Sequence, residues 1–277
     1  MPDFTALAEA DLPRAAALSA QVGWNQTVAD WRVFLARGAV RVLADADPAM
    51  LAATAGVLSY GRGVGWISMV LVRPDRRREG LATALLRWAT GHLRAAGVAS
   101  IALDATPAGQ AVYRGLGFRD LWGFSRWVLP AGLPAEPGLT VRPLAEADWP
   151  AVLALDAAAF GAPRAALLRD FARRLPGAAL VAETSAGLAG VLLGRDGVRG
   201  PQLGPLLAAD ARTARALLAA AAAPGAVLDL RDGALGLDAW LAAQGGAVQR
   251  SFTRMALGAD PPGDPGRIIA VAGPEFG

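Results

Sequence analysis

The residues best suited to chemistry lie between Val70 and Thr83, where a predicted strand runs into a basic turn that contains a glycine. The turn has the spacing Arg77-x-x-Gly80-x-Ala82 directly before a predicted helix. The first backbone N–H groups of a helix have no partner within it and carry partial positive charge, so they attract anions. Arginine side chains add charge-assisted hydrogen bonds to the same anion. The segment therefore predicts a site for a pyrophosphate group.

Each position of this turn has an expected role. Gly80 lets a phosphate approach the backbone closely and adopts backbone angles that bulkier residues avoid. Ala82 keeps the first helical turn narrow, Thr83 can donate from its hydroxyl, and Arg77 and Arg78 supply positive charge. Taken alone, so short a pattern is equally typical of a solvated basic turn. The neighbouring segments have to decide between the two interpretations.

A second set of polar residues follows the next predicted strand. Residues 103–109 read LDATPAG, and residues 113–118 read YRGLGF. Asp104 lies at the end of that strand and faces the same cleft, and Tyr113 lies on the short helix that comes next. The order strand, basic turn, helix, strand and tyrosine-bearing helix is uncommon, and it favours a functional site over a solvated turn.

Hydrophobic periodicity and turn residues place these segments in an α/β arrangement. Thr27 is the expected cap of the second helix, and Gly97 ends the helix that follows the basic turn. Helices are predicted at 7–20, 27–37, 81–96 and 109–115. Strands are predicted at 40–44, 52–60, 66–72, 98–103 and 118–127.

An internal repeat divides the chain. The segment LAEADLP at 7–13 returns as LAEADWP at 144–150, and FSRW at 124–127 returns as FTRM at 252–255. Two matches in the same order favour duplicated domains over chance similarity in an alanine-rich sequence. The prolines and glycines at 130–138 suit a linker. We therefore predict domains at 1–130 and 139–277.

Composition excludes several kinds of site. The 277 residues include no cysteine, which excludes disulfides, cysteine nucleophiles and thiolate metal ligands. The single histidine, His92, lies late in an amphipathic helix, where a packed or solvated role is expected, so we predict no metal site. All 27 basic residues are arginines, dispersed among 24 acidic residues to a net charge of +3. This dispersion argues against nucleic acid as a partner.

The hydropathy of the chain does not indicate a membrane protein. The sequence is 54% hydrophobic and has a mean hydropathy of +0.35, but alanine supplies much of both values. No apolar run approaches the ~18 residues that a membrane span needs. The first residues, MPDFTALAEADLPR, lack the basic and apolar regions of a secretion signal. We expect a cytoplasmic protein with no membrane partner.

With these motifs in place, residues 1–130 resemble the GNAT superfamily of N-acetyltransferases. Arg77, Gly80 and Ala82 match the family's acyl-CoA signature, and residues 113–118 match its second motif. The presence of a second, degenerate domain is similar to a bacterial subgroup of tandem GNAT proteins. The resemblance implies an α/β fold of two tandem GNAT-like domains, each with a mixed, mostly antiparallel central sheet flanked by helices.

The resemblance also implies acetyl-CoA as co-substrate and direct transfer to an amine, without an acyl-enzyme. Backbone groups of residues 70–72 would pair with the pantetheine arm in a splayed V between this strand and the one ending at Leu103. The lack of a cysteine and of a nucleophile-base pair fits direct transfer. The expected cofactor contacts are Val70, Leu71, Val72, Arg77, Arg78, Glu79, Gly80, Leu81, Ala82, Thr83, Thr106, Gly109 and Tyr113.

Amine attack on a thioester needs a proton donor for sulfur and a proton acceptor for nitrogen. Tyr113 is our candidate general acid, because a hydroxyl of pKa about 10 suits a thiolate of pKa about 8.5; the alternative is a core aromatic. Asp104 is the candidate base, although an aspartate before a turn commonly caps backbone amides. A water chain can replace the base. The oxyanion donor would be a backbone N–H near Leu71 or Val72.

The acceptor is expected to be a small-molecule or peptide amine. Trp24, Asn25 and Trp31 are candidate contacts, since the helix pair before the strands covers the substrate side in the family, but the tryptophans equally suit packing. In the second domain, Phe160 and Arg164 are candidates for acceptor contact or for packing at a helix start. A homodimer is left open.

The second half lacks the anion-binding signature. Residues 206–213 stand where the basic turn should be, without its arginine and glycine, and Leu241 stands in the place of Tyr113. We therefore expect one acetyl-CoA per chain. Residues 267–272 are predicted as one more strand. The main alternative function is a non-catalytic acyl-CoA-binding regulator, against which Tyr113 argues.

Overall fold

The computed structural model describes residues 2–185 and 187–277. In this part of the chain the strands form one continuous sheet of 12 strands in the order β1-β2-β3-β4-β5-β12-β6-β11-β10-β9-β8-β7. The strands are β1 Thr5–Ala6, β2 Gly38–Ala44, β3 Leu51–Tyr60, β4 Val64–Val72, β5 Ser100–Ala105, β6 Arg119–Val128, β7 Thr140–Pro143, β8 Leu180–Thr184, β9 Gly187–Arg195, β10 Gln202–Ala208, β11 Val227–Arg231 and β12 Ala247–Gly258. The helices are α1 Leu12–Gln21, α2 Val28–Arg37, α3 Leu81–Ala95, α4 Pro107–Gly115, α5 Trp149–Phe160, α6 Ala165–Arg174, α7 Ala211–Ala221 and α8 Leu237–Ala243.

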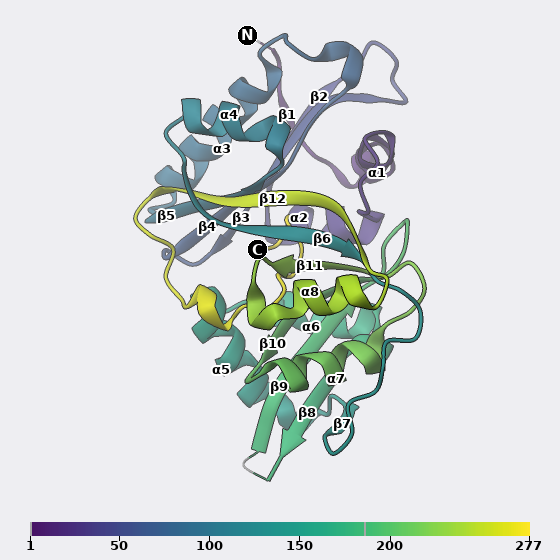
Figure 1. The fold of residues 1–277 in the computed structure, drawn as a ribbon. Helices are drawn as coiled ribbons and strands as arrows, with labels where there is room; N and C mark the ends of the chain where they lie inside the picture. Colours follow the sequence, from purple (N-terminus) through teal and green to yellow (C-terminus); the bar gives the residue numbers. More distant parts are fainter. Residues whose placement is uncertain (1, 186) are drawn as a thin grey trace.

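The sheet is mixed and mostly antiparallel, with parallel pairing between β4 and β5 and between β10 and β11. Helices pack against it in both halves, and the chain's two ends lie apart, the C-terminus near the middle of the molecule (Figure 1). The predicted fold class is confirmed.

The two halves exchange strands at the centre of the sheet (Figure 1). Strand β12, from the second half, lies between β5 and β6 of the first half and pairs antiparallel with both. Strand β6 in turn pairs with β11 of the second half. The domain boundaries predicted at residues 130 and 139 stay a prediction. In space, each half completes the other's sheet.

The repeated segments fold alike. In each, a single turn of 3₁₀ helix, at Glu9–Asp11 and at Glu146–Asp148, precedes the long helix. Asp11 accepts a hydrogen bond from the backbone N–H of Ala8 at 2.9 Å, and Asp148 accepts one from Ala145 at 2.7 Å. The first helix therefore begins later than the predicted residue 7, because the proline after this turn favours the first helical positions.

Helix α3 presents its apolar face to the inner strands of the first half. Leu81 and Leu85 pack on Ala53 and Ala55 of β3, whose small side chains let the helix approach the sheet closely. The helix ends at Ala95, one residue before the predicted limit, and Gly97 follows in the left-handed conformation. This packing fixes the helix N-terminus at the end of β4, where the basic turn lies.

The strand predicted at 267–272 is not formed: Arg267 ends a 3₁₀ turn, and residues 268–272 lie as a wedge between β10 and β11. These two parallel strands pair only at Gln202 and Leu203 and then diverge. Within the gap, the N–H of Leu206 donates to Ala270 at 3.0 Å, and the N–H of Val271 donates to Asp229 at 3.0 Å. Because each edge of the wedge meets a different strand, it forms isolated bridges and no ladder.

Within residues 2–185 and 187–277, no single helix has both the length and the apolar character to cross a bilayer. One bent pair, Glu146–Phe160 with Ala165–Arg174, reaches that length and composition only when its two helices are taken together across a 116° bend.

Candidate active site

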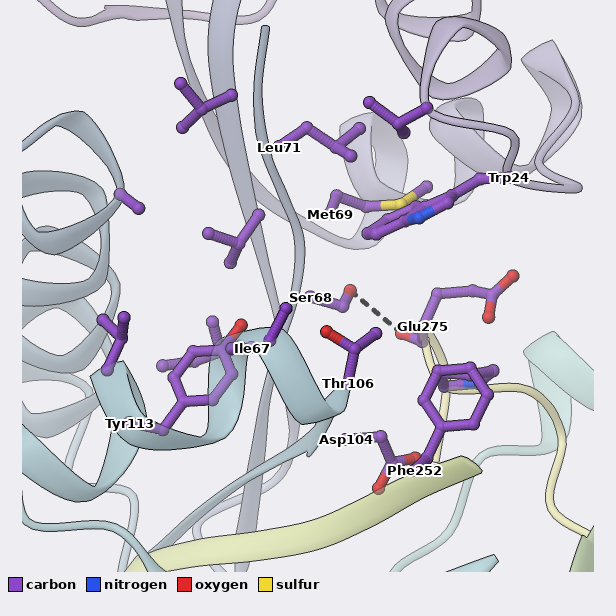
Figure 2. Close-up of a pocket in the computed structure, with 18 of the residues that line it drawn as sticks. Trp24, Ile67, Ser68, Met69, Leu71, Asp104, Thr106, Tyr113, Phe252 and Glu275 are labelled. Carbon is purple, nitrogen blue, oxygen red and sulfur yellow. Dashed lines mark hydrogen bonds between the residues drawn. The ribbon is translucent and has the colours of Figure 1, made fainter. Parts of the chain in front are cut away.

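A pocket opens where β4 and β5 separate. The two strands pair from Val64 with Ser100 to Trp66 with Ala102, and beyond this both continue without pairing to each other. This confirms the predicted V. The pocket has a volume of about 660 Å³. Figure 2 shows Tyr113 and Trp24 on opposite sides of it, with Thr106 between them.

Strand β4 carries a bulge at the pocket wall. Thr54 of β3 pairs with Leu71 and Gly56 pairs with Ser68, so two residues of β4 oppose one of β3. Met69, in the bulge, has φ +54°, a conformation that costs a non-glycine residue roughly 1–3 kcal/mol. The hydroxyl of Thr54 donates to the Met69 carbonyl at 2.7 Å and holds it. A bulge takes backbone groups out of the ladder, and here it does so beside the predicted oxyanion position.

The basic turn leaves the N-terminus of α3 open. Gly80 is the N-cap residue with φ +78°, no side chain caps the helix, and a Cβ at this position would meet nothing within 4 Å. Arg77 lines the pocket. In the described part of the chain neither Arg77 nor Arg78 has an acidic partner. The turn therefore has both free N–H groups and free positive charge for an anion.

The other two arginines of the turn are already neutralised. Arg73 contacts Asp45 at 3.2 Å and Asp75 at 2.8 Å. Arg76 contacts Glu79 at 2.8 Å, and this hydrogen bond is the main cause of the lowered pKa of Glu79. The Glu79 carboxylate serves the turn's own structure, and as an anion it is unsuited to touch a phosphate.

The structure brings eight of the predicted cofactor contacts to the pocket wall: Val70, Leu71, Val72, Arg77, Ala82, Thr106, Gly109 and Tyr113. Gly80 and Thr83 flank this wall at the start of α3, and Arg78 lies exposed beside them. Leu81 requires a correction. Its side chain is 3% exposed and packs in the core under α3, because the first apolar position of the helix faces the sheet. Only its backbone can reach a ligand.

Tyr113 is positioned by its own short helix. Its ring meets Phe118 edge-on at 6.1 Å, and a Cβ at Gly109 would lie 2.9 Å from the ring, so the glycine gives the ring its space. Burial raises the pKa of Tyr113 to about 12. The hydroxyl therefore stays protonated at neutral pH, as a proton donor must, but the raised pKa also makes it a weaker acid than a solvent-exposed tyrosine.

Asp104 lines the pocket as predicted, but its carboxylate is engaged. Arg254 of β12 binds both of its oxygens, at 2.9 Å each, and the pair is buried. Burial raises the pKa of Asp104 and the charge of Arg254 opposes this rise. The sequence analysis left two roles open for Asp104, a catalytic base or a cap of backbone amides. The structure shows an ion pair across the exchanged strands, and its role as base stays a prediction.

In the second half, the equivalent cleft is closed at two points. Asp210 caps α7 by accepting a hydrogen bond from the N–H of Thr213 at 2.7 Å, so a carboxylate occupies the position of a bound phosphate. The wedge at 268–272 fills the gap between the strands, where a Cβ at Gly204 would lie 2.0 Å from the Val271 carbonyl. Leu241 is fully buried.

Comparison with known families agrees with this duplicated architecture. Residues 10–118 match the model of the acetyltransferase (GNAT) family, and residues 152–270 match an acetyltransferase (GNAT) domain, so the two matches together cover most of the chain. The chain belongs to the GNAT acetyltransferases. It is a tandem member with one GNAT domain in each half. None of the curated proteins matches the sequence.

Solved structures share the tandem GNAT fold over nearly the whole chain. A Pyrococcus horikoshii protein assigned to the acetyltransferases has a TM-score of 0.80 at 20% identity, covering 99% of this chain and 95% of that one. A GCN5-related N-acetyltransferase from Sphaerobacter thermophilus has a TM-score of 0.65 at 16% identity, covering 95% and 97%. A tandem GNAT protein from the clavulanic acid biosynthesis pathway has a TM-score of 0.66 at 17% identity, covering 94% and 99%. At these identities the likeness shows the fold.

The three residues predicted to contact the acceptor in the first GNAT domain lie in different environments. Trp24 lines the pocket. Asn25 is buried and binds the second half, because its side chain donates to the Gly200 carbonyl at 3.0 Å and accepts from the N–H of Arg199 at 2.8 Å. Trp31 requires a correction: it is 0% exposed, lies in the core and donates to Ser19 at 3.0 Å.

Phe160 and Arg164 lie behind the pocket. Arg164 binds both carboxylate oxygens of Asp156 at 2.9 Å, stacks over the ring of Phe160 at 4.0 Å and donates to the carbonyl of Phe276 at 3.1 Å. Neither Phe160 nor Arg164 is among the residues that line the pocket. Their side chains hold the C-terminal segment in place, and a direct contact with an acceptor stays a prediction.

The C-terminal segment, residues 273–277, forms a pocket wall that the sequence analysis missed. Side chains of β3 and β4 donate to its carbonyls: Tyr60 to Phe276, Trp66 to Pro274 and Ser68 to Glu275, at 2.9, 2.9 and 3.1 Å. Figure 2 shows the last of these bonds. Residues 273–276, GPEF, match no motif, so no local sequence signal predicts that they line the pocket.

Glu275 anchors this segment through a buried charge network. Its carboxylate accepts hydrogen bonds from Gln26 at 2.6 Å and from Arg195. Burial pushes the pKa of Glu275 up, but the charges of Arg195 and Arg126 and the Gln26 bond outweigh it and hold the pKa below its usual value. Arg195 also contacts Asp30 of α2 at 3.3 Å. The network joins both GNAT domains beside the pocket.

Proposed function

We propose that the protein is an N-acetyltransferase that transfers an acetyl group from acetyl-CoA to an amine acceptor in a ternary complex. The observation that carries the proposal is the difference between the two GNAT domains. The first keeps an open cleft that leads from an uncapped helix N-terminus at Gly80 to Tyr113. In the second, Asp210 and the wedge at 268–272 occupy the same positions.

The residues of the first domain fit acetyl-CoA along its length. The N–H groups at the start of α3, with Arg77 and Arg78, suit the pyrophosphate. The free backbone edge of β4 at residues 70–72 suits the amides of the pantetheine arm. Apolar side chains such as Ile67 and Leu86 line the inner pocket and keep water away from the thioester.

In the proposed reaction the amine nitrogen attacks the thioester carbonyl carbon and the carbon–sulfur bond breaks. The nitrogen loses one proton to a water chain, with Asp104 as the candidate base, and the sulfur gains one. Tyr113 donates the proton to sulfur, since its hydroxyl is protonated at neutral pH and lies on the β5 side of the pocket. Backbone N–H groups at the bulge of β4 suit the developing oxyanion. Holding both reactants in one pocket can lower the activation free energy by ~7 kcal/mol or more.

A non-catalytic acyl-CoA-binding regulator is the alternative. Such a protein would need the same cofactor cleft but no proton donor at the thioester. Tyr113 beside the pocket and the polar wall on the opposite side favour the enzyme.

Isothermal calorimetry with acetyl-CoA tests the cofactor assignment. We expect one site per chain, because the second cleft is filled and its helix is capped by Asp210. A screen of amine acceptors, followed by release of the free thiol, tests the transfer. Two cofactor sites per chain would contradict the closed second cleft, and binding without transfer to any acceptor would favour the regulator.

Replacing Tyr113 by phenylalanine is expected to lower turnover by roughly ten- to a thousandfold, the lower part of the range that is usual for acid–base catalysis. Acetyl-CoA affinity should stay within a few fold, because the ring that contacts Phe118 is kept. Steady-state kinetics and calorimetry measure the two effects separately. Arg114→Gln, which changes an exposed side chain of the same helix that does not line the pocket, serves as the control. Unchanged turnover in the tyrosine variant would return Tyr113 to a packing role.

A further inference from the structure

We propose that the acceptor amine also carries an anionic group, a carboxylate or a phosphate, which Arg250 binds at the acceptor end of the pocket. This inference rests on the proposed transferase function and names the class of acceptor. It starts from a positive charge that the fold places in the pocket wall and does not neutralise.

Arg250 lies on the exchanged strand β12 and lines the pocket together with Phe252. Directly across the strand pair is Arg126, whose guanidinium binds both oxygens of Asp229 at 2.8 and 2.7 Å. In the part of the chain that the structure describes, Arg250 has no hydrogen bond and no ion pair. Like charges opposite each other on neighbouring strands destabilise a sheet. Asp229 compensates the charge of Arg126, and the charge of Arg250 has no ion-pair partner among the residues described.

A third arginine approaches the same place from the rim. The backbone of Arg199 is fixed by its bond to Asn25, and its guanidinium lies beside Gly23, where a Cβ would be 3.2 Å from Nη2. Gly23 precedes Trp24, which lines the pocket. Partial burial and the charge of Arg126, with a smaller contribution from Arg199, lower the pKa of Arg250, and the charge of Asp229 opposes this only in part. A bound anion would offset this repulsion and recover hydrogen bonds to charged groups.

The anion belongs to the acceptor rather than to the cofactor because of where Arg250 lies. Phe252 and Glu275 line this part of the pocket, and Figure 2 shows both on the same side as Trp24, across from Tyr113. The cofactor's pyrophosphate has its own site at the start of α3. Asn25, which sequence reasoning proposed as an acceptor contact, then acts indirectly by holding the loop of Arg199.

Sulfate is the probe for the anion site itself. Coenzyme A is first added to saturation, so that the turn at Gly80 is filled, and the thermal midpoint is compared in sodium sulfate and sodium chloride of equal ionic strength. Sulfate raises the midpoint of folded proteins in general, so the readout is the difference between variants: we expect a larger rise in the wild type than in Arg250→Gln, and the wild-type rise in Arg94→Gln, which removes an exposed arginine of α3. Equal rises in the wild type and Arg250→Gln would overturn the proposal.

Matched acceptors test the chemical class. Amino acids are compared with their amides, and phosphoethanolamine with ethanolamine, in the thiol-release assay. We expect the anionic member of a pair to have at least about a tenfold higher kcat/KM and Arg250→Gln to remove this preference. Neutral amines preferred by wild type and variant alike would contradict the inference while leaving the transferase function intact.

The same variant separates the acceptor from the cofactor's 3′-phosphate. If Arg250 binds the acceptor, Arg250→Gln should bind coenzyme A and dephospho-coenzyme A as the wild type does, within about twofold. A loss confined to coenzyme A would assign Arg250 to that phosphate and overturn the acceptor proposal. Failure of coenzyme A to bind the wild type would instead count against the proposed function.

Discussion

Replacing Gly80 by aspartate is expected to abolish acetyl-CoA binding while the protein stays folded. A Cβ at this position would meet no other atom within 4 Å, so the backbone site leaves room for a side chain at the open N-terminus of α3. There the carboxylate would occupy the space that suits the pyrophosphate. Two like charges about 4 Å apart repel by roughly 4 kcal/mol at the effective dielectric of a protein surface. We expect affinity to fall by at least about a hundredfold.

Asparagine at the same position is the matched control. Gly80 has φ +78°, and aspartate and asparagine are both tolerated in this left-handed conformation, so the two variants share their backbone strain and their shape. They differ in charge. Calorimetry should show a much smaller loss for Gly80→Asn than for Gly80→Asp. Equal losses would mean that the glycine matters for its shape alone, and unchanged binding in both would move the cofactor to another site.

The pocket wall that we propose for the cofactor could be located from the sequence because its residues are close together in the chain. Arg77, Gly80 and Ala82 lie within one turn, and a strand that runs into such a turn and then a helix has few alternative arrangements. Tyr113 could be predicted to lie at the pocket for the same reason, since the motif that marks it is contained in residues 113–118. The splay of β4 and β5 followed from the family resemblance and is present.

The acceptor side could not be predicted, because its walls come from distant parts of the chain. Arg254 reaches Asp104 across 150 positions through the exchange of β12, and no local pattern marks a strand for exchange. The two tryptophans show a further limit. Trp24 and Trp31 look alike in sequence, yet one precedes α2 and lines the pocket, while the other lies on the buried face of α2. Composition alone cannot assign a residue to a helix face.

The last ten residues of the chain connect the clefts of the two GNAT domains. The wedge at 268–272 fills the cleft of the second domain, and the C-terminal segment at 273–277 continues into the pocket wall of the first. The wedge therefore has two effects from one path of the chain. Under the proposed function it removes a cofactor site, and it brings Glu275 to the proposed acceptor side, where Arg195 compensates the charge of its carboxylate.

Replacing Arg195 by methionine is expected to destabilise the protein by about 3–5 kcal/mol, the usual cost of leaving buried charges without their partner. Arg195 is fully buried between Asp30 and Glu275, and its guanidinium lies over the ring of Phe276 at 5.3 Å. Burial already raises the pKa of Asp30 against the charges of Arg195 and Arg174. Without Arg195, two buried carboxylates would face each other across an apolar side chain.

Arg142→Met is the matched control for this variant. Arg142 also bridges two carboxylates, Asp148 and Glu183, but its side chain is 32% exposed, so solvent replaces the lost contacts and the expected cost is small. Urea unfolding measures both. A raised carboxyl pKa in the folded state favours the protonated form, so the deficit of Arg195→Met should shrink as the pH falls. Adding Glu275→Gln should recover part of the loss. Equal costs for the two arginine variants would show that the buried network does not hold the C-terminal segment in place.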